Sequence, residues 1–234
     1  MSDIRIATRA EWLAARKALL EKEKAHTRLK DEISAERRAL PWVPLETDYT
    51  FETESGPMPF EALFGAARQL VVYHFMFGAN WETGCKSCSF WADSFNGIAP
   101  HLENRDIGFV VVSRAPLAKL LPFKRRMGWD FPWVSSANST FNADFGVGFA
   151  PDRAPNSPVT YNYNDAAVFP VDEAHGTSVF ARDDGGQIYH TYSTYGRGLD
   201  VTNAAYAYMD LTPKGRNEPD GGNPMAWLRH HDDY

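Results

Sequence analysis

Residues 70–95 read LVVYHFMFGANWETGCKSCSFWADSF. The first eight of these residues, 70–77, are almost all apolar, which is typical of a strand buried on both faces in a parallel sheet. Residues 89–95 read as the opening of a helix. Cys85 and Cys88 stand between the two elements and are the only cysteines in the chain. A Cys-X-X-Cys between a strand and a helix indicates a dithiol that carries out redox chemistry.

Strands and helices alternate on both sides of this motif. A helix is expected after Cys88 as far as about Asn104, followed by a second buried strand at residues 107–112. Pro116 opens another helix, which runs through Met127 and is kinked or divided at Pro122. The order strand, helix, strand, helix predicts a βαβα unit with right-handed crossovers.

The N-terminal segment is predicted to be one long helix. Thr8 and Glu11 form a capping box, and neither Gly nor Pro follows until Pro41. A seven-residue repeat marks one face of this helix; its members are Trp12, Leu19, His26, Ile33 and Leu40. We expect the helix either to wrap around its own domain or to pack against a partner subunit.

The C-terminal half is predicted to hold an insertion, a hairpin and a helix. Residues 150–170 carry Pro151, Pro155, Pro158 and Pro170, which indicates an irregular insertion or flap. Residues 177–182 and 187–192 flank a strong turn signal and predict a hairpin. A helix is expected at about residues 202–211, and shorter elements at residues 49–52, 60–64, 131–134 and 140–145.

Composition limits the function classes. A chain of 234 residues with 44% apolar residues suits one globular domain with extensions. It has no apolar run of about eighteen residues and no apolar stretch at its N-terminus, so we expect neither a membrane span nor a signal peptide. The expected location is the cytoplasm, where paired cysteines are more often redox or metal sites than structural disulfides.

Charge is distributed unevenly. The net charge of −6 argues against general nucleic-acid binding. Residues 5–40, however, hold ten basic and six acidic side chains. This basic helix would bind an anionic partner, or pack against the acidic body of its own molecule or of a second copy.

The two cysteines are expected to have different roles. Cys85 would lie where the helix begins, near unpaired N–H groups and the Lys86 ammonium, and both favour a thiolate. Cys88, one turn further along, would be more buried. The sequence therefore predicts that Cys85 attacks a disulfide and that Cys88 resolves the mixed disulfide.

Other interpretations of the pair remain open. Two cysteines alone do not complete the four ligands of a structural zinc site, which would need His74, His101, His175 or a second subunit. The pair is also compatible with two inert cysteines. A peroxiredoxin signature would place Pro seven and Thr or Ser three positions before the attacking cysteine. For Cys85 those positions hold Gly78 and Glu82, so the signature is absent.

Five stretches resemble one bacterial family; they are residues 73–78, 84–88, 126–129, 190–200 and 210–216. The family has no known function and is classed as predicted dithiol-disulfide oxidoreductases of thioredoxin-like fold. The resemblance extends from about Trp12 to Tyr234. It implies an α/β fold with a thioredoxin-like central mixed sheet flanked by helices.

The motif departs from that of ordinary thioredoxins, which have Trp before the first cysteine and Gly-Pro between the two. Here Gly84 precedes Cys85, and Trp81 lies four residues upstream, where it is a candidate to cover the site. Thioredoxins also place a cis-proline opposite the disulfide. The corresponding stretch here includes Gly176 and Thr177 and has no proline.

Arg197, between Gly196 and Gly198, is a candidate to bind a carboxylate or phosphate. The alternative, which the residue pattern favours at least as much, is an ion pair within the fold.

Together these patterns predict an N-terminal helical arm at 1–44, a thioredoxin-like domain at 45–212 and a tail at 213–234. The expected function is thiol–disulfide oxidoreduction on a protein or small-molecule thiol or disulfide, with no cofactor and with the N-terminal helix as a homodimer arm. The alternative is a non-catalytic binding module with a metal held by the cysteines.

Overall fold

The structure, a computed structural model, describes residues 4–150, 152–154 and 157–234. It consists of two compact units, Met1–Pro41 and Trp42–Tyr234. Pro151 and Pro155 of the expected insertion lie outside the described residues, as do residues 1–3 of the arm. Within the described part of the chain, no helix is long and apolar enough to cross a membrane.

The first unit contains one helix, α1 (Arg9–Arg38), of 30 residues. The Thr8 hydroxyl accepts a hydrogen bond from the backbone N–H of Glu11 at 3.3 Å, and the Glu11 carboxylate accepts one from the N–H of Thr8 at 2.8 Å. The predicted long helix and its capping box are therefore confirmed. Leu40 lies beyond the end of α1, so the last member of the seven-residue repeat is outside the helix.

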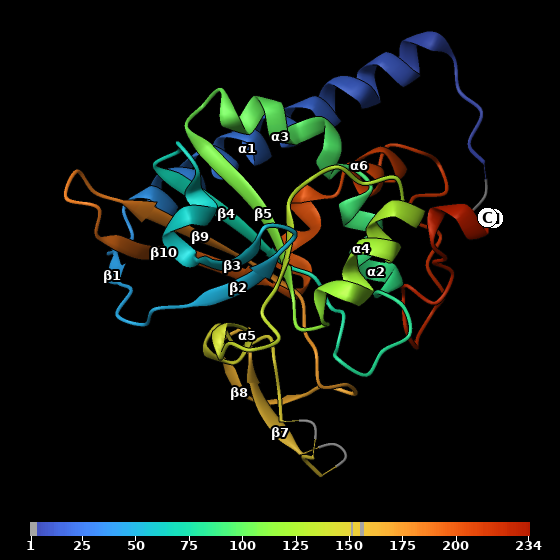
Figure 1. Cartoon of the computed structure of the whole chain (residues 1–234). Coiled ribbons are helices and arrows are strands. Elements are labelled where there is room, and N and C mark those ends of the chain that lie inside the picture. Colours follow the sequence, from blue (N-terminus) through green and yellow to red (C-terminus); the bar gives the residue numbers. More distant parts are fainter. Residues whose placement is uncertain (1–3, 151, 155–156) are drawn as a thin grey trace. The chain divides into compact units, whose positions relative to one another are not determined.

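The second unit is built on an eight-stranded sheet (Figure 1). Its strands, in spatial order, are β1 (Val43–Pro44), β10 (Ile188–Tyr195), β9 (Gly176–Arg182), β4 (Gln69–His74), β5 (Ile107–Ser113), β6 (Trp133–Ser135), β2 (Thr50–Thr53) and β3 (Gly56–Pro59). Because β1 pairs with β10, residues 43 and 44 belong to the sheet, and the arm ends at Pro41 rather than at residue 44.

The centre of the sheet has the thioredoxin-like arrangement. Strand β4 is connected to β5 through α2 (Lys86–Ala92) and α3 (Phe95–Glu103), and β5 to β6 through α4 (Leu117–Arg126). The three strands are parallel, whereas β9 is antiparallel to β4 and forms a hairpin with β10. The order β10-β9-β4-β5 thus combines a parallel βαβ half with an antiparallel hairpin, and the predicted mixed α/β fold is confirmed.

The single helix predicted from Cys88 to Asn104 is wrong. The chain breaks at Asp93 and Ser94 into α2 and α3. The Ser94 hydroxyl donates to the carbonyl of Trp91 at 2.8 Å, and the Asp93 carboxylate accepts from the indole of Trp129 at 3.0 Å. Short polar side chains compete with the helix in this way, which sequence periodicity does not reveal. Helix α4, by contrast, is one helix with Pro122 inside it.

Two aromatic clusters pack on opposite faces of the sheet, as strand alternation requires. Tyr73 of β4 lies in the cluster under α2, α3 and α4, which also contains Cys88. Leu70 and Val72 lie in the other cluster, with residues of the 3₁₀ helix η1 (Phe60–Phe64) and of α5 (Phe141–Asp144). The helices of the βαβα unit therefore share one face of the sheet with the cysteines.

The region at 150–170 is more regular than the sequence predicts. It holds a hairpin of β7 (Pro158–Tyr161) and β8 (Asn164–Val168), separate from the main sheet (Figure 1). Asn162 and Tyr163 form its turn with φ of 53° and 60°. Asn tolerates this conformation, but a Tyr at positive φ is uncommon, so the turn has no strong signal in the sequence.

The rest of the second unit is short helices and loops. These helices are η2 (Gly196–Thr202), α6 (Ala204–Met209) and η3 (His231–Asp233). The helix expected at residues 202–211 corresponds to α6, and the tail after Pro213 contains only η3 among its described helices. Leu228 and His230 of that tail are nevertheless buried.

Candidate active site

Cys85 caps the start of α2, where the loop after β4 ends. Its backbone N–H donates to the carbonyl of Met76 at 3.0 Å. Its own carbonyl accepts from both the N–H and the hydroxyl of Ser89, each at 2.9 Å. The predicted junction of a buried strand, a loop and a helix is confirmed, and the backbone of Cys85 is fixed on both sides.

The two thiols have contrasting environments. Cys85 is half-buried, whereas Cys88 is fully buried and accepts a 3.4 Å hydrogen bond from the N–H of Met76. The pKa of Cys85 is lowered to about 7, chiefly by the Cys88 thiol and also by the N–H groups of Cys88 and Ser87, against the effect of burial. Burial and then the neighbouring Cys85 raise the pKa of Cys88. At neutral pH Cys85 is therefore the cysteine whose thiol ionises.

Two tyrosines lie near Cys88. The Tyr73 side chain is buried, and its hydroxyl forms no aligned hydrogen bond with any described residue. Burial raises the pKa of Tyr73 first, and charge on Cys88 raises it further. Burial is also the main cause that raises the pKa of Tyr161, with a contribution from Cys88. Tyr161 belongs to β7, and its hydroxyl donates to the carbonyl of His175 at 2.9 Å, so the hairpin at 158–168 contacts the residue before β9.

The structure gathers most of the other predicted site residues around the motif. Gly84 is buried and Trp81 is half-buried against the cluster that contains Cys88. Gly176 and Thr177 open β9 and lie opposite His74 and Tyr73 of β4. Within the described residues the chain has no cis peptide bond, so the thioredoxin cis-proline has no counterpart in its backbone geometry.

Lys86 is the first residue of α2 and is exposed. The groups that lower the pKa of Cys85 are instead Cys88 and Ser87. The influence of the Lys86 ammonium on the sulfur stays a prediction.

Two residues that the sequence analysis missed hold the loop before Cys85. The Lys119 ammonium, on α4, donates to the carbonyls of Ala79 at 2.9 Å and Trp81 at 3.1 Å. The His230 imidazole, in the tail, donates from Nε2 to the carbonyl of Gly84 at 3.0 Å. A lone lysine on a helix and a histidine near a chain end carry no local signal for such contacts.

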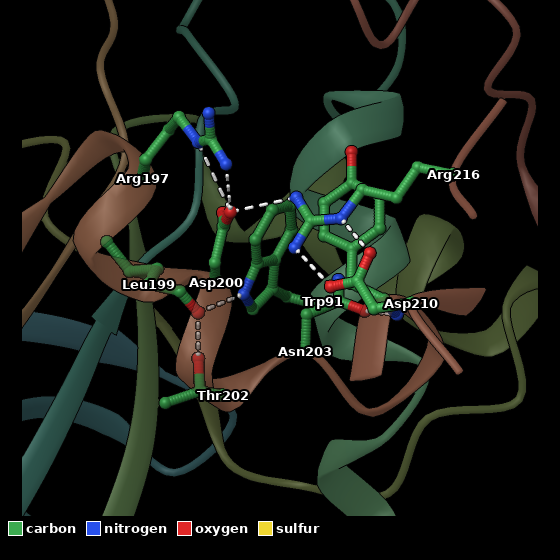
Figure 2. A network of polar contacts seen from close by, with 9 residues as sticks. Trp91, Arg197, Leu199, Asp200, Thr202, Asn203, Asp210 and Arg216 are labelled. Atoms are coloured by element: carbon green, nitrogen blue, oxygen red, sulfur yellow. Dashed lines mark hydrogen bonds and ion pairs between the residues drawn. The ribbon is translucent and has the colours of Figure 1, made fainter. Parts of the chain in front are cut away.

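Arg197 lies in a polar network with Asp200, Asp210 and Arg216 (Figure 2). Its guanidinium is largely exposed and donates to Asp200 at 3.2 Å. Arg216 also donates to Asp200, at 2.8 Å, and to Asp210 at 2.9 Å. The indole of Trp91 donates to the carbonyl of Leu199 at 3.0 Å, which joins this network to α2.

A cavity of about 150 Å³ lies beside this network. Its lining includes Trp91, His175, Arg197, Tyr206, Arg216 and Met225. Trp91 is six residues after Cys85, which corresponds to about 9 Å along a helix. One wall of the cavity is thus formed by α2, the helix that begins directly after Cys85 and contains Cys88.

The three histidines considered as metal ligands lie on different segments of the fold. His74 is buried, contacts Ser178 through a 2.8 Å hydrogen bond and has its pKa lowered to about 3 by burial. His175 lies before β9 and His101 in α3. Among residues 4–150, 152–154 and 157–234, no three His, Cys, Asp or Glu side chains are grouped to hold a metal ion.

Gly84→Ala tests the close packing of the loop. A Cβ at this position would lie 2.7 Å from the ring of Phe123 and 2.9 Å from the ring of Phe75. Overpacking of this kind costs about 1–3 kcal/mol, so we expect the free energy of unfolding to fall by that amount. Gly97→Ala, in α3, is the matched control, because its Cβ would meet no atom within 4 Å. Denaturant unfolding measures both variants, and equal stability of the two would contradict the packing.

Solved structures similar to this chain include several peroxiredoxins. Peroxidoxin BcpB from Mycobacterium tuberculosis is 19% identical, with 70% of this chain and 93% of that chain covered and a TM-score of 0.44. A PrxQ mutant from Xylella fastidiosa is 16% identical, with 71% and 95% covered and a TM-score of 0.44. The mitochondrial 2-Cys peroxiredoxin from Plasmodium falciparum is 11% identical, with 72% and 93% covered and a TM-score of 0.42.

No curated protein matches the sequence. A family match, by contrast, extends over residues 1–234, the whole chain. This agrees with the family resemblance carried by the motifs from Tyr73 to Arg216. The chain belongs to the family described as bacterial protein of unknown function, DUF899.

Proposed function

We propose that this protein is a thiol–disulfide oxidoreductase in which Cys85 attacks and Cys88 resolves. One observation carries the proposal: in the same Cys-X-X-Cys, Cys85 is half-buried and has a lowered pKa, whereas Cys88 is fully buried and has a raised pKa. This asymmetry matches the requirements of the exchange reaction, because only the thiolate is nucleophilic.

The reaction begins with the Cys85 thiolate. It attacks one sulfur of a substrate disulfide, forms a mixed disulfide and releases the other sulfur as a thiolate, which takes a proton from solvent. Cys88 then loses its proton and attacks the Cys85 sulfur. An intramolecular disulfide forms and the second substrate thiol leaves, so the substrate gains the two electrons that the dithiol loses. A small or protein thiol returns the pair to the reduced state by the reverse steps.

Two groups are proposed to help Cys88 in the second step. The N–H of Met76 already donates to its sulfur at 3.4 Å. The buried Tyr73 hydroxyl is a second donor for the thiolate that forms during attack. Hydrogen bonds to the charged form of a group favour that form, so both donors lower the cost of ionising a buried thiol.

The surface that the substrate covers is proposed to be lined by Trp81, Gly176 and Thr177. Trp81 is half-buried beside the loop, and the other two open β9 next to Tyr73. The proposed setting is the cytoplasm, where thiols are kept reduced.

Arg197 is proposed to attract anionic substrates. Its guanidinium is exposed and shares its partner Asp200 with Arg216. We expect Arg197→Ala to slow exchange with oxidised glutathione, which is anionic, about three-fold, because exposed charges contribute little. Exchange with the neutral 2-hydroxyethyl disulfide should not change. Equal slowing with both probes would contradict a role in charge recognition.

Helix α1 is proposed to be a homodimer arm. A seven-residue repeat along it, which is a pattern of pairing helices, consists of Trp12, Leu19, His26 and Ile33. We expect deletion of residues 1–41 to halve the mass measured by light scattering. An unchanged mass would rule out the arm.

Reduced protein mixed with oxidised glutathione tests the proposed function. We expect one intramolecular disulfide to form per chain and two molecules of glutathione to be released. Mass spectrometry after alkylation measures the first, and a thiol assay measures the second. A protein that keeps two free thiols under these conditions would not be an oxidoreductase of this kind.

A further inference from the structure

The C-terminal tail reaches back to the loop that carries Cys85. We infer that His230 is a positioning residue for Cys85, acting through the peptide group that joins Gly84 to Cys85. This inference rests on the proposed function, since it concerns the same thiol.

That peptide group is held at both of its polar atoms. Its carbonyl oxygen, from Gly84, accepts a 3.0 Å hydrogen bond from His230 Nε2. Its N–H, from Cys85, donates to the carbonyl of Met76 at 3.0 Å. The two contacts come from distant parts of the sequence, Met76 and His230, and fix the plane of one peptide group. The position of the Cys85 sulfur over the N–H groups of Ser87 and Cys88 depends on that plane.

The surroundings of His230 leave its imidazole little freedom. The side chain is 2% exposed. Its ring packs edge-to-face on the ring of Phe123, with centroids 5.3 Å apart. Phe123 also lies against Gly84, where a Cβ would come within 2.7 Å of its ring. The other ring nitrogen, Nδ1, faces the carboxylate of Asp233 at 3.4 Å.

The tail is anchored to the two helices beside the loop. Arg126, in the last turn of α4, donates to Asp232 at 2.7 and 2.9 Å and to Asp233 at 3.1 Å. His231 contacts Asp93, at the end of α2, at 2.7 Å. The tail therefore delivers one hydrogen-bond donor to one defined atom of the active-site loop.

The test measures the pH dependence of Cys85 alkylation in the full-length protein. His230→Phe keeps an aromatic ring on Phe123 but removes the donor, and we expect it to raise the pKa of Cys85 by about one unit. His230→Gln keeps an Nε2 donor and should leave the profile close to that of the wild type. His101→Phe, at an exposed residue of α3, is the matched control and should have no effect. A role in stability alone would not move the pH profile, nor would Gln restore it.

The outcomes separate the inference from the proposed function. A low Cys85 pKa in the wild type that His230→Phe leaves unchanged would overturn the inference alone. An ordinary Cys85 pKa in the wild type would overturn both. If His230→Phe does not fold, His230→Asn replaces it, because its shorter side chain does not reach Gly84. In that case a Cys85 pKa that is raised in His230→Asn but not in His230→Gln supports the inference. Equal pH profiles of alkylation in the two variants overturn it.

Discussion

Replacing Cys85 by serine is expected to abolish disulfide exchange. Replacing Cys88 by serine is expected to stop the reaction at the mixed disulfide on Cys85. A serine hydroxyl does not ionise near neutral pH, so Cys85→Ser should lower the rate with oxidised glutathione by more than about a thousandfold. Cys88→Ser keeps the attacking thiolate but removes the thiol that resolves the intermediate. We therefore expect it to accumulate one glutathione per chain.

Mass spectrometry of the intact chain, without added reductant, measures the adduct. The variant with both serines is the control for non-specific modification. The structure explains the asymmetry, since Cys85 is half-buried and Cys88 is 1% exposed. An adduct that forms on Cys88 in the Cys85→Ser variant as fast as on Cys85 in the reverse variant would contradict the assigned roles.

The second large effect is the pH dependence of Cys85 reactivity. Because the pKa of Cys85 is lowered to about 7, its rate of alkylation should rise through a midpoint near pH 7 and level off above pH 8. An ordinary cysteine with a pKa of about 8.5 is only about 3% thiolate at pH 7, so Cys85 should react roughly fifteen-fold faster. Cys88 should stay unmodified over this range, because burial raises its pKa.

Cys88→Ala tests most directly what lowers the pKa of Cys85. The Cys88 thiol is the largest contributor that lowers the pKa of Cys85, and alanine removes this donor. We expect the alkylation midpoint to move to higher pH in this variant, whereas Lys86→Ala should shift it less. A midpoint that moves only when Lys86 is replaced would assign the effect to the exposed ammonium instead.

Local patterns were sufficient to predict the frame of the site. The apolar run at residues 70–77 predicts β4, and the cysteine spacing places a helix start at Cys85, as the structure has it. The hairpin of β9 and β10 follows from its Asp-Asp-Gly-Gly turn. Each of these signals lies within about ten residues, where turn chemistry and strand periodicity dominate.

Contacts between distant residues could not be predicted in this way. His230 is 146 residues from Gly84, and Lys119 is 40 residues from Ala79. Neither contact follows from periodicity, because it exists only once the tail and α4 have packed on the loop. The break at Asp93 has the same origin, since its carboxylate has a partner in Trp129. The strand and helix that carry the cysteines can thus be predicted from short stretches of sequence. The residues that hold the loop in place come from distant parts of the chain and cannot.

A glutathione redox titration of the Cys85–Cys88 pair tests the central claim most directly. Samples are equilibrated at fixed ratios of reduced to oxidised glutathione and alkylated, and the mass of the chain is measured by mass spectrometry. Metal content is measured in the same samples. We predict a reversible two-electron transition at a potential more oxidising than about −300 mV. No transition, or one masked by bound metal, would contradict the account and favour a binding module with a thioredoxin-like fold.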